Sequence, residues 1–209
     1  MRWKSAKLPR QALFMNLDVN EIFYSLQGEG SRQGEASIFI RLTRCNLSCD
    51  FCDTDFETGQ NMSLEEILSE ISPYHCRWII WTGGEPTLQL TDEVLLFFKS
   101  KGYKQAIESN GLKPLSGLLD YTVCSPKGGN LATVKRINPK VNEIRLPVKS
   151  KDKLPEIQEL PEADYYFLSP VFTSNSQITA ENINYCVELI KENPEWRLSV
   201  QLHKLINIP

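Results

Sequence analysis

The chain has 209 residues, of which 41% are hydrophobic and 23% are charged, and its net charge at pH 7 is −3. This is the length of a single domain with enough apolar side chains for a sizeable core. The lack of a basic excess argues against nucleic-acid binding, and no apolar run approaches the ~18–20 residues that cross a bilayer. We therefore expect a protein that binds neither nucleic acid nor a membrane.

The first segment, residues 1–18, is basic at its start and lacks the apolar run and cleavage site of a secretory signal. We expect an irregular N-terminal extension, followed by a single domain over residues 19–209. Without a signal the expected compartment is the reducing cytoplasm. There, the scattered Cys76, Cys124 and Cys186 are expected to be buried free thiols and not disulfide partners.

Segments typical of strands and helices alternate along the rest of the chain. Apolar, β-branched and aromatic runs predict strands over 37–43, 77–81, 104–108, 121–124, 143–148, 164–168 and 196–201. Apolar periodicity predicts helices after Ser63, which forms a capping box with Glu66, and over 92–100, 153–160 and 179–192. This order predicts an α/β fold with a mainly parallel sheet covered by helices. Six or seven strands cannot close an eight-stranded barrel, so we expect an open, partial β/α barrel with ligands at the C-terminal strand ends.

Three cysteines, Cys45, Cys49 and Cys52, follow the first predicted strand with the spacing C-x3-C-x2-C. Thiolates this close on one loop can converge on a soft metal site. A structural zinc ion takes four closed ligands and an electron-transfer cubane usually has four cysteines. Because both histidines are distant in sequence, three ligands favour a [4Fe–4S] cluster with one iron open to a small molecule. A zinc site or a chance group of buried thiols is the alternative.

A second motif, Thr82-Gly83-Gly84-Glu85-Pro86, follows the strand predicted over 77–81. Paired glycines let a ligand approach the backbone closely, and the adjacent acid could accept a hydrogen bond from an ammonium group. The alternative is an ordinary Gly-Gly turn closed by Pro86. In their order and separation, the two motifs resemble the radical S-adenosylmethionine (SAM) superfamily. That resemblance implies that the open iron chelates SAM and that reductive cleavage of SAM yields a 5'-deoxyadenosyl radical.

Further segments narrow the resemblance. The most specific is Glu-Ile-Phe-Tyr-Ser-Leu-Gln-Gly-Glu-Gly at 21–30, and Arg41, Asp53-Thr54, Ser125-Pro126-Lys127 and the terminal Pro209 agree with it. Together they resemble the 7-carboxy-7-deazaguanine synthase family over residues 20–209. The resemblance implies a radical SAM lyase that converts 6-carboxy-5,6,7,8-tetrahydropterin to 7-carboxy-7-deazaguanine with loss of ammonia, in queuosine and other 7-deazapurine biosynthesis.

The same resemblance implies residue roles. The three cysteines would hold the cluster, and Thr54 would offer a hard oxygen to Mg²⁺. The SAM site would comprise Phe51, Cys52, Asp53, Gly84, Glu85, Ser109, Ser125, Pro126, Lys127, Ser169, Pro170, Val171 and Phe172. The pterin site would comprise Leu26, Gln27, Gly28, Glu29, Arg41, Thr82, His203 and Pro209. Ser169-Pro170 stands where the family pattern has Gln-Pro, so the side chain at 169 departs from that pattern.

Within the pterin site, Arg41 would bind the substrate carboxylate with its planar fork, and Glu29 would bind the aminopyrimidine edge. Purely structural roles are the alternatives: a surface strand arginine for Arg41, a solvated loop acid for Glu29, a turn residue for Thr54 and a packing role for His203. No side chain is assigned a catalytic role beyond binding.

The resemblance also implies partners, namely a second copy of the chain in a homodimer and a flavodoxin or ferredoxin as reductant. Two other functions are open. A glycyl-radical activating enzyme shares the cysteine spacing but acts on a protein glycine and needs no pterin pocket. A non-enzymatic Fe–S electron-transfer or zinc-binding module predicts a fourth ligand and no Gly-Gly-Glu-Pro loop. The segment at 21–30 argues against the first and the Gly-Gly loop against the second.

Overall fold

The computed structural model describes residues 15–209 with the exception of 53–56 and 128. Most of the expected N-terminal extension therefore lies outside the described residues. The first strand, β1 (Asn16–Leu26), begins within the range 1–18, so residues 16–18 belong to the sheet and not to an irregular extension. None of the described helices combines the length and apolarity needed to cross a membrane.

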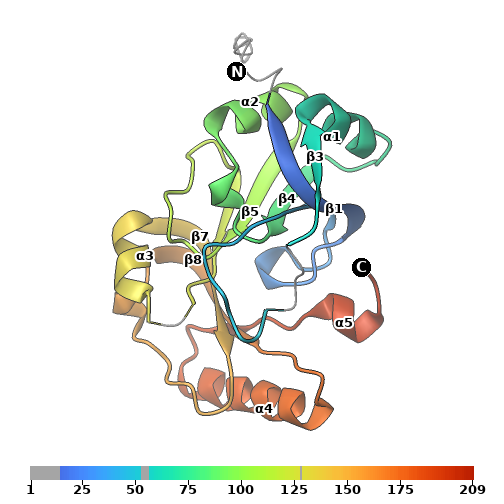
Figure 1. Ribbon diagram of the computed structural model, residues 1–209. Helices are drawn as coiled ribbons and strands as arrows, with labels where there is room; N and C mark the ends of the chain where they lie inside the picture. Colours follow the sequence, from blue (N-terminus) through green and yellow to red (C-terminus); the bar gives the residue numbers. More distant parts are fainter. Residues whose placement is uncertain (1–14, 53–56, 128) are drawn as a thin grey trace.

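A single mixed sheet runs through the described part of the chain (Figure 1). Its strands are β1, β2 (Ala36–Leu42), β3 (Gln60–Ser63), β4 (Trp78–Gly83), β5 (Lys104–Ser109), β6 (Tyr121–Cys124), β7 (Lys140–Val148), β8 (Glu162–Pro170) and β9 (Arg197–Leu198). Their order is β3-β1-β2-β4-β5-β6-β7-β8-β9. Strand β1 pairs antiparallel with β2 and β3, and every pair from β2 to β9 is parallel. The sheet is open, because β3 and β9 are its two edges, and this confirms the predicted partial barrel.

The helices are α1 (Leu64–Ile71), α2 (Asp92–Ser100), α3 (Leu131–Ile137), α4 (Ser176–Glu192) and α5 (Leu202–Ile206). In Figure 1, α1 and α2 lie at the top of the molecule, α3 at the left and α4 at the bottom. One core cluster joins the strands of the N-terminal half to α1 and α2, and a second joins β7 and β8 to α3 and α4. Cys76, Cys124 and Cys186 are buried in these clusters as free thiols, as predicted.

Several predicted elements need correction. The helix expected over 153–160 is only a 3-10 turn at Ile157–Glu159, in a segment interrupted by Pro155 and closed by Pro161. The strand expected over 196–201 is only Arg197–Leu198. Strands β1 and β3 and helices α3 and α5 were not predicted, so the sheet exceeds the six or seven strands expected. Both missed strands carry many polar side chains because they lie at the antiparallel edge.

The alternation of side chains along each strand separates the two faces of the sheet. On β2 and β4, Ile38, Ile40 and Trp81 point outward into the core beneath α1 and α2. The neighbouring Phe39 and Ile80 point inward, where they form a separate small cluster. Toward the C-terminal ends of the strands the inward positions become polar. The outer face therefore stabilises the fold, and the inner face is available for a site.

Helix α1 shows how a local signal fixes the position of an element. The hydroxyl of Ser63 accepts a hydrogen bond from the Glu66 N–H, and the Glu66 carboxylate accepts one from the Ser63 N–H at 2.7 Å. This is the capping box predicted from the sequence. It orients the helix so that Leu64, Ile67 and Ile71 are buried against the sheet.

Replacing Ser63 by alanine removes the hydroxyl that caps α1 and is expected to lower the free energy of unfolding by about 1 kcal/mol. Urea unfolding followed by circular dichroism measures this loss. The control is Ser69→Ala, at an exposed position inside the same helix, where a change within about 0.5 kcal/mol is expected. Equal losses in the two variants would contradict the capping role of Ser63.

Candidate active site

A cavity of about 280 Å³ opens on the inner face of the sheet, at the C-terminal ends of the parallel strands. Every described residue that the sequence assigned to the site lines this cavity, with the exception of Pro126. They are Leu26, Gln27, Gly28, Glu29, Arg41, Cys45, Cys49, Phe51, Cys52, Thr82, Gly84, Glu85, Ser109, Ser125, Lys127, Ser169, Pro170, Val171, Phe172, His203 and Pro209. Asp53 and Thr54 lie outside the described residues.

Pro126 departs from the prediction, because it does not line the cavity. It is buried between Ser125 and Lys127, both of which line the cavity. Lys127 donates a hydrogen bond to the Ser125 hydroxyl at 2.7 Å. Burial lowers the pKa of Lys127, although the nearby Cys49 and Glu29 oppose the shift.

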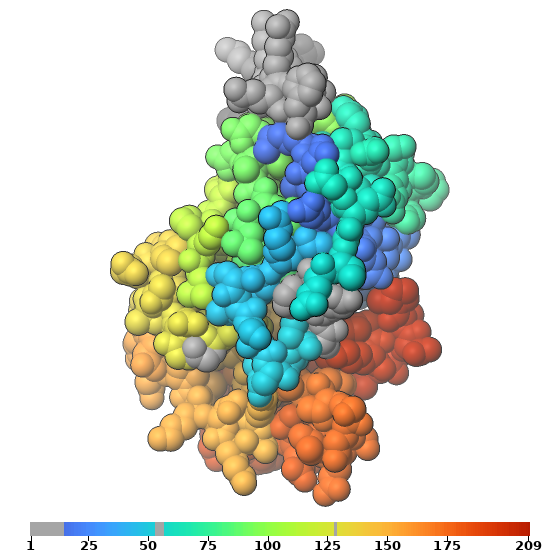
Figure 2. Space-filling model, in the orientation of Figure 1, coloured from blue at the N-terminus to red at the C-terminus, as the bar shows by residue number. Residues whose placement is uncertain are grey.

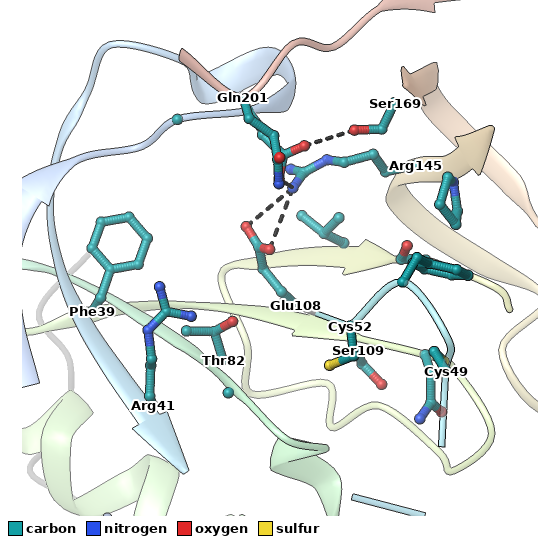
Figure 3. Close-up of a pocket in the computed structure, with 18 of the residues that line it drawn as sticks. Phe39, Arg41, Cys49, Cys52, Thr82, Glu108, Ser109, Arg145, Ser169 and Gln201 are labelled. Carbon is teal, nitrogen blue, oxygen red and sulfur yellow. Dashed lines mark hydrogen bonds and ion pairs between the residues drawn. The ribbon is translucent and has the colours of Figure 1, made fainter. Parts of the chain in front are cut away.

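The cluster loop, residues 45–52, carries Cys45, Cys49 and Cys52 at one wall of the cavity. Figure 3 shows Cys49 and Cys52 at this wall. The Cys52 N–H donates to the Cys49 carbonyl at 3.2 Å. This bond closes a turn in the loop, and both Cys49 and Cys52 line the cavity. Cys45 and Cys49 are half-buried and Cys52 is exposed. Burial raises the pKa of the Cys45 thiol above its usual value.

The donor set of this loop is three thiolates, which are the ligands that iron–sulfur clusters take. In the described part of the chain, no three His, Cys, Asp or Glu side chains surround a point that one metal ion could occupy. A [4Fe–4S] cluster at this loop would take Cys45, Cys49 and Cys52 as its protein ligands, and the cavity lining contains no further cysteine among the described residues. One iron would then be open to an external ligand.

The Gly-Gly loop after β4 is attached to the segment that leads into the cluster loop. The Gly84 N–H donates to the Leu42 carbonyl at 2.8 Å, and the Glu85 N–H donates to the Arg44 carbonyl at 2.8 Å. A Cβ on Gly84 would overlap the carbonyl oxygen of Arg44. Gly83 has φ of 103°, a backbone region that side chains disfavour. The two glycines are therefore required for the approach of the Gly-Gly loop to the chain before Cys45.

The Glu85 carboxylate is 1% exposed and is occupied by protein donors. It accepts hydrogen bonds from the N–H and hydroxyl of Thr87, from the Ser109 hydroxyl at 2.8 Å and from the Asn110 N–H at 2.8 Å. These contacts join the Gly-Gly loop to the turn after β5. An acceptor role for Glu85 toward an ammonium group stays a prediction, and the structure gives the carboxylate a clear organising role.

The opposite wall is formed by the loop after β1 and the segment after β9. The Leu202 N–H donates to the Gly28 carbonyl at 3.0 Å, and a Cβ on Gly28 would overlap the imidazole ring of His203. The Ser25 hydroxyl donates to a Pro209 oxygen at 2.8 Å. Residues 25–28 and 202–209, far apart in sequence, therefore form one continuous wall.

Arg41 enters the cavity from the antiparallel edge of the site. Its Nε donates to the Glu21 carboxylate at 3.0 Å, a cross-strand pair between β1 and β2. Its guanidinium lies 5.2 Å from the centroid of the Phe23 ring, which stacks on Phe39 at 4.8 Å. Figure 3 shows Arg41 beside Thr82 and Phe39, facing Glu108 across the cavity.

Two charged residues that the sequence analysis did not assign to the site line the cavity. Glu108, at the end of β5, accepts from Gln27 Nε2 at 2.9 Å and from Arg145 Nη1 at 3.3 Å. Arg145 also donates to Glu29 at 3.2 Å, and Ser169 Oγ donates to Glu29 at 2.6 Å. Ser169, the departure from the family pattern, thus supports a predicted pterin-site residue. The sequence did contain a signal for these two residues. Each is a charged residue within a predicted buried strand, and a buried charge is rare without a partner.

Comparison with known proteins agrees with this geometry. A family model described as the radical SAM superfamily matches residues 39–170. The chain is 40% identical over 190 residues to a 7-carboxy-7-deazaguanine synthase from Bacteroides thetaiotaomicron, with 91% of this chain and 97% of that protein covered. It is 40% identical over 201 residues to a protein of the same name from Haemophilus influenzae, with 92% and 94% covered. The crystal structure of QueE from Escherichia coli shares the fold, with a TM-score of 0.71 and 24% identity over 96% of this chain and 100% of that one.

Gly84→Ala is expected to weaken SAM binding by about 10–100-fold, because the added Cβ meets backbone and displaces the loop. Equilibrium binding of SAM to the anaerobically reconstituted protein measures the effect. Gly117→Ala is the control, because a Cβ at Gly117 meets open space. If the two variants bound SAM equally well, the close approach at Gly84 would have no role in the site.

Proposed function

Because the chain belongs to the radical SAM superfamily and, within it, to the 7-carboxy-7-deazaguanine synthase family, we propose that it converts 6-carboxy-5,6,7,8-tetrahydropterin to 7-carboxy-7-deazaguanine with release of ammonia. The observation that carries the proposal is a single cavity with two chemically distinct walls. One wall has the cluster loop and the Gly-Gly loop. The other has carboxylates, an arginine and the segment at 202–209, which suit a polar heterocycle with its own carboxylate.

The family uses a [4Fe–4S] cluster and SAM, and Cys45, Cys49 and Cys52 are the residues that would hold the cluster. When bound, these groups supply a carbon-centred radical that abstracts hydrogen from the substrate. The remaining work falls to the protein. The backbone at Gly84, the 125–127 segment and the 169–172 segment would surround SAM. Phe51 would pack beside it, held between Lys127 at 5.6 Å and Lys149 at 5.1 Å from its ring centroid.

On the other wall, the proposed roles follow from charge and direction. Arg41 would bind the carboxylate of the pterin, because Glu21 and Phe23 hold its guanidinium at the cavity edge. Glu29 would accept hydrogen bonds from the N–H groups of the aminopyrimidine edge. Gln27, Gly28 and Leu26 would frame that edge, and Thr82, His203 and Pro209 would close the pocket around the ring.

Further parts of the proposal rest on the family resemblance. Mg²⁺ would bind substrate with Thr54, which lies outside the described residues. The protein would be a cytoplasmic homodimer formed from single-domain chains, with the domain beginning near β1. A flavodoxin or ferredoxin would reduce the cluster. In Figure 2 the segment around residue 50, in cyan, lies at the surface above α4, in orange, and Cys52 is exposed, which supports access of a reductant to this side.

The proposal is tested by anaerobic turnover of cluster-reconstituted protein with dithionite, SAM, Mg²⁺ and 6-carboxytetrahydropterin. Mass spectrometry is expected to show 7-carboxy-7-deazaguanine. Release of 5'-deoxyadenosine and methionine without this product would leave radical SAM chemistry in place and refute the substrate. A chain acting as a glycyl-radical activating enzyme, or as a non-enzymatic Fe–S or zinc module, would give no deazaguanine.

Cys49→Ala is expected to abolish cluster content and turnover together, because two thiolates do not hold a stable cubane. Iron and sulfide analysis, with the product assay, measures both. Cys76→Ala is the matched control: its thiol is buried in the core, away from the cavity, and full cluster content is expected. Loss of the cluster in both variants would point to unfolding.

Arg41→Ala is expected to raise the KM for the pterin by about 10–100-fold, the loss of a hydrogen bond between charged groups, while SAM cleavage continues. Initial rates at varied pterin and at varied SAM separate the two effects. Arg77→Ala, which removes an arginine that contacts Tyr103, is the control. An unchanged KM for the pterin in Arg41→Ala would show that Arg41 does not bind the substrate.

A further inference from the structure

A buried charge cluster occupies the floor of the cavity, where β5 and β7 meet the loop after β1. Arg145 is at its centre, with a side chain that is 5% exposed, and three carboxylates surround it. Glu143 accepts from Nε at 3.0 Å and from Nη2 at 2.7 Å. Nη1 donates to Glu29 at 3.2 Å and to Glu108 at 3.3 Å. One guanidinium thus contacts three acids with its separate N–H groups.

The three carboxylates are not equivalent. Glu143 is 1% exposed and also accepts from the Tyr121 hydroxyl and the Ser31 N–H, both at 3.0 Å. Its acceptors therefore face protein donors behind the cavity, and it does not line the cavity itself. Glu143 anchors one edge of the guanidinium. That anchor leaves Nη1 directed toward the cavity.

Glu29 and Glu108 differ from Glu143 because both line the cavity. Ser169 and Arg145 hold the two oxygens of Glu29, and Gln27 and Arg145 hold Glu108. An ionised carboxylate has about four acceptor sites, so each retains capacity toward a ligand. Burial opposes ionisation of Glu108, but the charge of Arg145 and the hydrogen bonds from Gln27 and Arg145 lower its pKa below the usual value.

We propose that Arg145 is a positioning residue that holds Glu29 and Glu108 side by side as hydrogen-bond acceptors for the N–H donor edge of the substrate. This inference rests on the proposed function and deepens it by assigning the residue that shapes the recognition wall. An aminopyrimidinone ring carries adjacent ring N–H and amino donors, which two acceptors on one wall can bind together. Arg145 acts through the carboxylates and touches no reacting atom.

The geometry requires an arginine. The planar guanidinium has donors on two sides. Its Nε donates to Glu143, and its Nη1 donates to Glu29 and Glu108, which line the cavity. A lysine ammonium at the same position keeps the charge, but it is a compact point charge with three rotatable donors and does not reproduce the planar fork. The variant Arg145→Lys therefore keeps the positive charge at this position and removes the planar fork that positions the carboxylates.

The first test measures affinity for 6-carboxypterin, an oxidised and non-reacting form of the proposed substrate. Calorimetry on the cluster-loaded, unreduced enzyme is expected to show about tenfold weaker binding or worse in Arg145→Lys, with SAM affinity within about twofold of the parent. Arg32→Lys is the matched control, since Arg32 is a buried arginine that pairs with Glu35 and stacks on Trp78. Equal affinities in the parent and Arg145→Lys would overturn the inference.

A second test does not depend on the identity of the substrate. Carbon-13 NMR of glutamate carboxyl groups, assigned with Glu108→Gln, follows the titration of Glu108 in ligand-free protein. The charged groups around it are Arg145 from β7, Arg41 from β2, Lys127 from the loop after β6 and Glu29, which shares Arg145 Nη1 with it. The neutral Gln27, also from the loop after β1, donates to it.

The variant for this titration is Glu143→Gln/Arg145→Gln, which avoids leaving Glu143 buried without its partner, and Glu143→Gln alone is its control. The inference is supported if the pKa of Glu108 rises by at least one unit in the double variant and does not rise in the control. One unit is a tenfold change in proton affinity. An unchanged pKa overturns it. If the parent enzyme binds no pterin while the shift is observed, the proposed function fails and the role of Arg145 toward the carboxylates stands.

Discussion

The alternation of side chains along the parallel strands is the constraint on which the rest of the molecule depends. Each strand must place one set of residues against the helices and the other set inside the curve of the open sheet. The outward set is apolar and completely buried, as for Ile38, Ile40 and Trp81. Because the outer face alone supplies the large core, the inner face near the strand ends can carry Arg41, Glu108 and Arg145.

Placing charges on that inner face is costly unless each is paired and hydrogen-bonded. The structure meets this demand with one guanidinium shared among three carboxylates and with donors from Gln27, Ser169 and Tyr121. The same contacts define the direction of each acceptor. A network of this kind contributes specificity more than stability, because an apolar replacement could fill the same space but would leave the cavity without recognition groups.

The site also depends on backbone connections between loops that follow different strands. The Gly-Gly loop is bonded to the chain before Cys45, the Glu85 carboxylate bonds the turn after β5, and Asn110 Nδ2 donates to Asn46 in the cluster loop at 2.8 Å. Three consecutive strand ends are thereby joined into one surface. Cluster and SAM chemistry requires such fixed geometry, since a displacement of about 1 Å can cost a large factor in rate.

The sequence by itself determined the local features of this protein. It defined the β-α-β alternation, the capping box of α1, the cysteine and Gly-Gly motifs at strand ends, and the cavity residues that lie within those motifs. These depend on contacts a few residues apart, which a linear pattern records. It failed for the polar antiparallel strands β1 and β3, and it did not assign Glu108 and Arg145, both inside predicted strands, to the site. Only the tertiary structure decided that Arg145 meets Glu29 and Glu108, and that residues 202–209 close against Gly28, because strand register and long-range packing bring together residues whose separation in sequence carries no local signal.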